Sequence, residues 1–296
     1  MAYRTVITLK AHHDNDADFR ATGLAVKNAL IAMGWVQTGD TGQVDWSTVT
    51  RPGTVNTVAG YEIWRMADAL QSTNPVFMKL EWGTGNVSIA QPTMWVQIAT
   101  GSNGSGSLTG PTSTRHRTCV SSTSTSSFNC LMTGDTNRAL VALFVNGQAD
   151  TRAIGFSIER EVDANGNLVS SNGGVLLSFF HDPNAPNYEQ EFWSPSSGGL
   201  GVEGNLGILA PLVGTGVDGF DITLFPQFHA AGIFKPAGLN LFGYFSASLA
   251  AGVPVTVTVY GNSHEYYPLG ATFANNAGKA TRGGPAGVSL LARYDA

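Results

Sequence analysis

Ionised side chains are scarce in this chain of 296 residues. They make up 12% of the sequence, about half of the roughly 25% that is usual for soluble proteins. A monomeric enzyme normally keeps a charged exterior, whereas a surface that is covered in an assembly tolerates few charges. The composition therefore predicts a protein that packs against neighbouring subunits.

Basic runs are missing as well, and the formal net charge is -5. The densest basic spot is Arg115-His116-Arg117, which a solvated loop explains better than phosphate binding, because nucleic-acid affinity requires several neutralising contacts. The sequence also has no apolar run of the roughly 20 residues that a membrane-spanning helix needs. We therefore expect no nucleic-acid partner and no membrane span.

Cysteine occurs only twice, at Cys119 and Cys130. The segment between them is rich in serine and threonine, and a hairpin there would bring the two thiols within disulfide reach. A pair of free thiols is the alternative, which we favour for a chain that stays in a reducing cytoplasm. The first residues lack a basic leader followed by an apolar stretch, so no secretory signal is expected and synthesis in the cytoplasm is implied.

The N-terminal third of the sequence predicts strands and two helices. Tyr3 to Lys10 alternate as a strand does, and an apolar stripe from Phe19 to Met33 predicts a helix that Gly34 ends. A second helix is predicted at Tyr61 to Ser72. Two further strands are predicted at Val76 to Trp82 and at Met94 to Thr100.

The rest of the chain predicts β structure. Residues 101–129 are mostly glycine, serine and threonine, which predicts a long surface arm that becomes ordered against a partner. Strands are expected at Ala139 to Val145, Ala153 to Glu161, Gly174 to Phe180, Phe220 to Phe225, Asn240 to Ser248, Val253 to Tyr260 and Val288 to Tyr294. The first three of these strands should form a meander, because strong turn signals separate them.

These elements predict an α+β fold that is mainly β, with an antiparallel, sandwich-like core and about two helices in the N-terminal third. The expected domains are an α+β region at 1–100, a Ser/Thr/Gly-rich loop or arm at 101–130 and a β-rich region at 131–296. A single intertwined domain is the alternative arrangement.

Several short patterns resemble metal or catalytic sites but have simpler explanations. Asp14, Asp16 and Asp18 begin like a calcium loop, yet the motif's glycine and final glutamate are absent, so helix capping explains them better. Glu159 and Glu161 share a strand face, where solvent-facing charges are a simpler explanation than an acid–base pair. We predict no catalytic residue, no metal site and no cofactor.

An aromatic and acidic patch is the strongest candidate for a binding surface. It consists of Tyr188, Glu189, Glu191 and Trp193, in a stretch rich in proline and glycine. Aromatic faces and carboxylates are what a carbohydrate site offers, although aromatic side chains more often pack in cores and interfaces. We keep these four residues as a candidate contact for a glycan or a partner protein.

Two blocks of sequence are familiar. One comprises residues 60–85, which read GYEIWRMADALQSTNPVFMKLEWGTG, and residues 92–110; the other comprises residues 257–270 and 288–296. They resemble segments of virion structural proteins of tailed bacteriophages, particularly tail-tip, baseplate or fibre-associated subunits. The resemblance covers roughly a quarter of the chain. It implies a location in the virion, in the tail rather than the head, and it assigns no functional residue.

The resulting hypothesis is a non-enzymatic structural subunit of a phage tail, with copies of itself and other virion proteins as partners. Such particles repeat one subunit in closed rings, so surface becomes interface and low charge is tolerated. The alternatives are a receptor- or glycan-binding tail module, a head-decoration protein and a tailspike-like glycosidase. A host surface glycan is the partner that the first of these alternatives requires.

Overall fold

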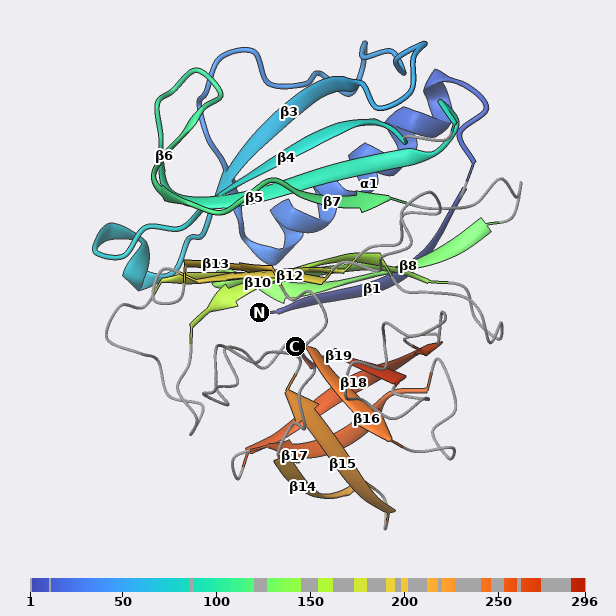
Figure 1. Ribbon diagram of the computed structural model, residues 1–296, viewed down its shortest axis with the longest axis vertical. Coiled ribbons are helices and arrows are strands. Elements are labelled where there is room, and N and C mark those ends of the chain that lie inside the picture. The colour runs from blue at the N-terminus through green and yellow to red at the C-terminus, as the bar shows by residue number, and fades with distance from the viewer. Residues whose placement is uncertain are drawn as a thin grey trace.

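The computed structural model describes residues 2–10, 12–85, 88–119, 127–144, 154–161, 173–179, 190–194, 198–201, 212–217, 220–226, 241–245, 253–259, 262–272 and 289–295. In these residues the chain is mainly β, with three antiparallel sheets and one α-helix (Figure 1). The predicted fold class is therefore confirmed, with one helix in place of about two.

Sheet A crosses the middle of Figure 1 and has seven strands. In spatial order they are β1 (Tyr3–Lys10), β8 (Ser127–Asp135), β9 (Arg138–Phe144), β10 (Ile154–Arg160), β11 (Gly174–Phe179), β12 (Gln190–Ser194) and β13 (Gly198–Gly201). The predicted meander is confirmed in β9, β10 and β11. The N-terminal strand β1 pairs with β8, and Tyr3 lies opposite Gly134. Two segments that are more than 100 residues apart in the sequence are therefore neighbours in one sheet.

Sheet B lies above sheet A in Figure 1. Its strands are β2 (Val36–Gln37), β3 (Val58–Arg65), β4 (Phe77–Thr84), β5 (Pro92–Ser102) and β6 (Leu108–Thr112), and β7 (His116–Cys119) pairs with β5 beside β6. The predicted alternation of β4 is confirmed, because Met78, Leu80 and Trp82 are buried in the core. The other face of β4 carries Lys79 and Glu81.

The helix predicted at Tyr61 to Ser72 is wrong. Residues 61–65 belong to β3, and only a short 3-10 helix, η1 (Ala69–Ser72), follows. Strand alternation turns Glu62 and Trp64 inward, where both are fully buried. Two indole N–H groups donate to the Glu62 carboxylate, so an inward acidic residue is satisfied. Tertiary contacts of this kind override the local helical pattern.

The surface arm predicted from residue 101 is also wrong as far as residue 119. The segment forms β6 and β7, which supply their backbone hydrogen bonds to β5. Pairing with an existing strand stabilises a segment that has few apolar side chains of its own. His116 and Thr118 of β7 face the core and are buried, which explains how a polar stretch becomes part of the sheet.

Helix α1 (Asp16–Met33) follows the predicted limits closely. Asn15 caps its start, because its side chain accepts a hydrogen bond from the Asp18 N–H at 3.0 Å. Gly34 ends it in the left-handed conformation, φ 93°, which favours glycine. The predicted stripe is confirmed, because Phe19, Gly23 and Val26 are among the buried residues of the helix.

The core lies between sheets A and B, and α1 is inserted on one side of it. Strands β5 and β7 contact β10 and β11 directly, whereas α1 contacts β1 and β8 of sheet A and β2 of sheet B. Figure 1 shows the helix between the two sheets. On one side of the core the two sheets pack directly on each other, and on the other side α1 packs between them.

A small closed barrel completes the chain and lies on the other side of sheet A (Figure 1). Around it run β14 (Leu212–Val217), β15 (Phe220–Pro226), β16 (Leu241–Phe245), β19 (Ser289–Arg293), β18 (Asn262–Thr272) and β17 (Val255–Val259). Strands predicted from the sequence account for β15, β16, β17 and β19. Strand β18 was not predicted, although it pairs with both β17 and β19.

Candidate functional site

The outward side of α1 is an uncharged surface. Its exposed residues from position 21 to 32 are Ala21, Leu24, Asn28, Ile31 and Ala32, and we call them the outer face of α1. Leu24 is 42% exposed and Ile31 is 53% exposed, and their spacing of seven residues places both on one side of the helix. Val36 of β2, which is 37% exposed, continues this apolar surface beyond the end of the helix.

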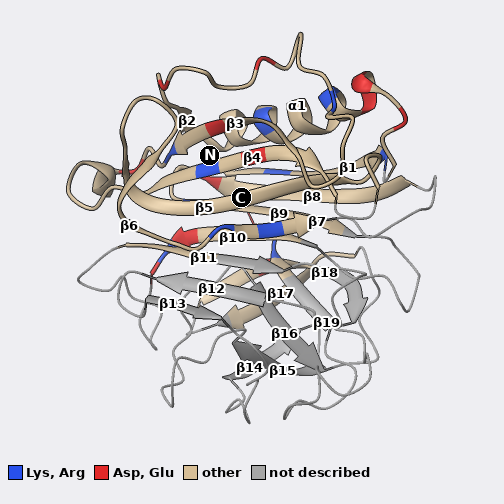
Figure 2. Cartoon of the chain, turned by 45° about the horizontal axis from the view of Figure 1, so that its top comes forward, with Lys and Arg blue, Asp and Glu red and all other residues tan. Residues whose placement is uncertain are grey.

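The charges of α1 lie away from its outer face. Asp16 and Asp18 are in the first turn, and Figure 2 shows the acidic residues gathered at that end of the helix. Arg20 donates to the backbone carbonyl of Ser47 at 2.8 Å. Lys27 turns toward the interior, where its Nζ lies 3.9 Å from Glu62 Oε1. None of the exposed residues from position 21 to 32 is therefore ionised, and the partly exposed side chains of Arg20 and Lys27 flank them.

A buried polar centre holds α1 against sheet B. The indole Nε1 atoms of Trp46 and Trp82 donate to the two oxygens of Glu62 at 3.0 and 3.1 Å. Burial raises the pKa of the Glu62 carboxyl, and the two indole N–H groups together with Lys27 oppose that rise. Hydrogen bonds at this centre therefore join β3, β4 and the connection that carries Trp46, and Lys27 of α1 approaches the same carboxylate as an ion pair.

Gly23 brings the helix close to this centre. A Cβ atom at Gly23 would lie 1.8 Å from the Trp46 ring, so only glycine allows the ring to pack on the helix backbone. The Trp46 ring also meets that of Trp82 edge-on, with ring centroids 5.1 Å apart. At the other end of the helix, Trp35 Nε1 donates to the Arg138 carbonyl at 3.2 Å. The outer face of α1 is therefore presented on a rigid support.

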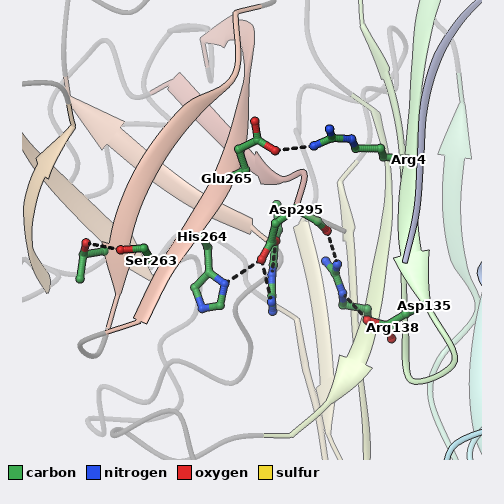
Figure 3. Close-up of polar contacts among 9 residues, drawn as sticks. Arg4, Asp135, Arg138, Ser263, His264, Glu265 and Asp295 are labelled. Carbon is green, nitrogen blue, oxygen red and sulfur yellow. Dashed lines mark hydrogen bonds and ion pairs between the residues drawn. The ribbon is translucent and has the colours of Figure 1, made fainter. Parts of the chain in front are cut away.

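A second set of contacts joins the barrel to sheet A, as Figure 3 shows. Asp295 lies at its centre and accepts from His264 Nδ1 at 2.8 Å and from Arg293 Nε at 2.6 Å. The backbone carbonyl of Asp295 accepts from Arg138 of β9 at 2.6 Å, and Arg138 also donates to Asp135 at 2.9 Å. Although burial opposes it, these donors lower the pKa of the Asp295 carboxyl.

The N-terminal strand takes part in the same joint. Arg4 of β1 forms an ion pair with Glu265 of β18 and lies over the Tyr294 ring, 4.8 Å from its centroid. Tyr294 in turn packs against Tyr267, with ring centroids 5.3 Å apart. The joint therefore brings residues from both ends of the chain together, and it fixes the barrel on sheet A.

The predicted aromatic and acidic patch is only partly described. Tyr188 and Glu189 lie outside the described residues. Glu191 and Trp193 are at alternate positions of β12, opposite Ser178 and Leu176 of β11. The backbone pairing places these two positions in sheet A, and their role as a glycan or partner contact stays a prediction.

The two cysteines lie in strands of different sheets. Cys130, in β8 of sheet A, is a free thiol that is fully buried, and burial raises its pKa. Cys119 ends β7, where it lies opposite Thr93 of sheet B. The hairpin that would have joined the two positions is not formed, because β7 and β8 pair with different strands.

The acidic start of α1 has the structure of a helix cap. Lys10 Nζ lies 3.0 Å from Asp18, and the backbone N–H of Asp14 donates to Asp18 at 3.1 Å. Within the described ranges, no group of three or more His, Cys, Asp or Glu residues is placed to hold a metal ion. In the same ranges, no helix is both long and apolar enough to cross a membrane.

The expectation for the two glutamates at the end of β10 is wrong for one of them. Glu161 is buried, so it is not a solvent-facing charge. Between them, Arg160 is also buried and makes a bidentate contact with Asp68, at 2.9 and 2.6 Å. The register of β10 beneath sheet B places these side chains against the β3–β4 connection.

Sequence reasoning missed the residues that stand out in the structure. Leu24 and Ile31 lie within the predicted helix but outside its apolar stripe. Apolar residues outside the stripe were the sequence signal that could have indicated an exposed apolar face. The contacts of Asp295 and Arg138 had no local signal, because the two residues come from distant strands. No family model, no curated protein and no solved structure matches the chain.

Proposed function

We propose that this chain is a non-enzymatic structural subunit that assembles with copies of itself and with other proteins of a tailed-bacteriophage virion, in the tail tip, baseplate or fibre assembly. The observation that carries the assembly role is the uncharged outer face of α1, with Leu24 and Ile31 exposed on it. Exposed apolar surface of this kind is typical of protein–protein contacts. The virion location rests on the resemblance of residues 60–85, 92–110, 257–270 and 288–296.

A second copy of the chain is a suitable partner for this face. In a two-fold contact both copies use the same surface patch, so a patch with charges of one sign would meet the same sign on its partner. The outer face of α1 has no such charge, because Lys27 is engaged with Glu62. A helix of this length extends over about 27 Å, which is long enough to form the centre of a standard interface.

The buried titratable groups fit a structural role. His13 lies 2.8 Å from the Thr22 hydroxyl, and Glu62 accepts from two indoles. These contacts keep α1 in place, although the Nδ1 atom of His13 has no hydrogen-bond partner among the described residues. Arg160 and Asp68 similarly join the two sheets. Each of these groups has a packing partner that accounts for its burial.

The test is the mass of the full chain in solution. We expect sedimentation equilibrium to show an oligomer, and Ile31→Glu to shift it to the monomer without changing the thermal unfolding temperature. Val55→Glu is the matched control, because Val55 is also apolar and 45% exposed but lies in the connection before β3. It should leave the oligomer intact.

Two results would contradict the proposal. A wild-type chain that stays monomeric at every concentration would remove the self-assembly role, and so would an Ile31→Glu variant that assembles normally. Reconstitution with purified virion parts tests the location separately, because a subunit of the tail should be retained on tail structures. A monomer that turns over a small molecule or cleaves polysaccharide would replace the proposal with an enzymatic one.

A further inference from the structure

An open pocket of about 530 Å³ lies at the end of sheet B, beside the β3–β4 connection. The residues that line it include Arg65, Asp68, Gln71, Ser72, Pro75 and Phe77. Pockets of roughly 300 to 1,000 Å³ accommodate small molecules, so this volume suits a ligand of one or two sugar rings. The pocket shares no residue with the outer face of α1 or with the barrel joint.

Hydrogen bonds and an ion pair hold the wall of the pocket in place. Arg160 of β10 contacts both carboxylate oxygens of Asp68 and donates to the Asn74 carbonyl at 2.6 Å. Gln71 Oε1 accepts a hydrogen bond from the Val76 N–H at 3.0 Å. This bond joins the 3-10 helix of the β3–β4 connection to the residue just before β4. A ligand would therefore meet a preformed surface, and little ordering entropy would oppose binding.

The charge of the pocket is positive because one of its two ionised groups is already neutralised. Asp68 is paired with the buried guanidinium of Arg160. The Arg65 side chain makes no hydrogen bond or ion pair with any residue that the structure describes, and Arg65 lines the pocket. A free guanidinium offers a planar pair of donors that matches the geometry of a carboxylate.

An apolar ring lies beside this guanidinium. Arg65 and Phe77 are direct partners in the β3–β4 register, so their side chains stand next to each other on the same face of sheet B. Pro75 adds a second apolar ring to the lining, and the amide nitrogen of Gln71 adds hydrogen-bond donors. A donor for a carboxylate therefore adjoins a flat apolar surface.

We infer that this pocket binds a carboxylated sugar, such as a uronic acid unit of a polysaccharide. The Arg65 guanidinium pairs with the carboxylate, and the Phe77 ring packs against the C–H face of the sugar. Aromatic packing and a small number of placed polar groups are the usual means of fixing such a ligand. A phosphate would require more neutralising groups than the single free arginine, and a peptide would require a free strand edge, which the connection lacks.

The test is binding of the full chain to oligogalacturonate, measured by isothermal titration calorimetry. We expect binding that is at least about tenfold weaker for a neutral galactose oligomer, and weaker still for acetate. Arg65→Gln should reduce the affinity for oligogalacturonate by about tenfold or more, as loss of one charge-assisted bidentate contact does. Phe77→Leu should reduce it as well, because it removes the flat ring but stays apolar.

Lys79→Gln is the matched control, since Lys79 carries the same charge on the same face of sheet B but does not line the pocket. It should leave the affinity unchanged, and circular dichroism should show that all variants fold. Absence of oligogalacturonate binding would overturn the inference, as would full affinity in Arg65→Gln. Equal affinity for acetate would identify a general anion site, and tighter binding of an acidic peptide would identify a protein-binding site; either result would also overturn it.

Discussion

His13 and His116 show how single buried residues make stability depend on pH. His13 is packed at the start of α1 and His116 in β7, and burial lowers the pKa of each imidazole from 6.5 to about 4. For His13 the nearby Arg51 adds to this effect, and Asp18 opposes it. Both rings therefore stay neutral in the folded chain at a pH where they are protonated in the unfolded chain.

The folded protein should lose stability as the pH falls. Between pH 6.5 and about 4 the unfolded chain binds protons at these histidines and the folded chain does not, so stability is fully present above this window and decreases through it. The loss is on the order of 3 kcal/mol for each histidine at most. Urea unfolding at a series of pH values measures it.

Replacing one histidine shows how much of the pH dependence of the unfolding free energy that histidine causes. His13→Gln should make the decline of the unfolding free energy between pH 6.5 and 4 shallower, because glutamine does not titrate. An equally steep decline in that variant would show that the pH dependence arises from other groups.

At the scale of the elements, the β3–β4 connection is joined to sheet A by one buried ion pair. Arg160 and Asp68 are respectively 3% and 11% exposed in their side chains, so water screens the pair little. The same connection lines the pocket beside Arg65. The stability of the connection and the shape of the pocket therefore depend on the same contact.

Arg160→Met should destabilise the chain by roughly 3 to 5 kcal/mol, because it leaves the Asp68 carboxylate buried without its partner. The double variant Asp68→Asn with Arg160→Met should lose less than the sum of the two single variants. Chemical unfolding measures all three. Arg115→Met is the comparison, because it breaks the ion pair between Arg115 and Glu81, and the side chain of Arg115 is 41% exposed. This variant should lower the free energy of unfolding by less than about 1 kcal/mol. Additive losses at Asp68 and Arg160 would mean that the two side chains are not coupled.

At the scale of the whole molecule, the barrel and the sandwich are separate β units that meet at Asp295. The joint consists of polar contacts from β1, β9 and β18, and its ion pair between Arg4 and Glu265 is exposed. Polar joints of this type resemble the interfaces between domains within one chain. The position of the barrel relative to sheet A therefore depends on a few hydrogen bonds.

Asp295→Ala should destabilise the barrel relative to the sandwich, because it removes the carboxylate but keeps the backbone carbonyl that accepts from Arg138. All tryptophans of the sequence lie before residue 194, so tryptophan fluorescence reports on the sandwich, whereas calorimetry reports on both units. We expect the fluorescence transition to stay nearly unchanged while an earlier calorimetric transition appears, because His264 and Arg293 lose their acceptor. A single transition at the wild-type temperature would show that the Asp295 carboxylate does not stabilise the barrel.

The sequence by itself determined the elements whose signals are local. Gly34 marks the end of α1, and the acidic residues before Phe19 indicated a capped start, although the structure assigns the N-cap itself to Asn15. The alternation of β4 and the turns of the meander are equally local. The low charge also followed from composition alone, and the covered surface that it predicts stays a proposal.

Only the tertiary structure decided the features that depend on distant partners. Glu62 can face the interior because two tryptophans donate hydrogen bonds to its carboxylate and Lys27 lies nearby. The residues next to Glu62 in the sequence do not indicate these partners. Strands β6 and β7, which lie in the serine- and threonine-rich segment, form because β5 offers them an edge. The exposure of Leu24 and Ile31 follows from where the two sheets cover α1 and where they leave it open. The physical reason is the same in each case, since burial and pairing are set by neighbours that the chain brings together only when it folds.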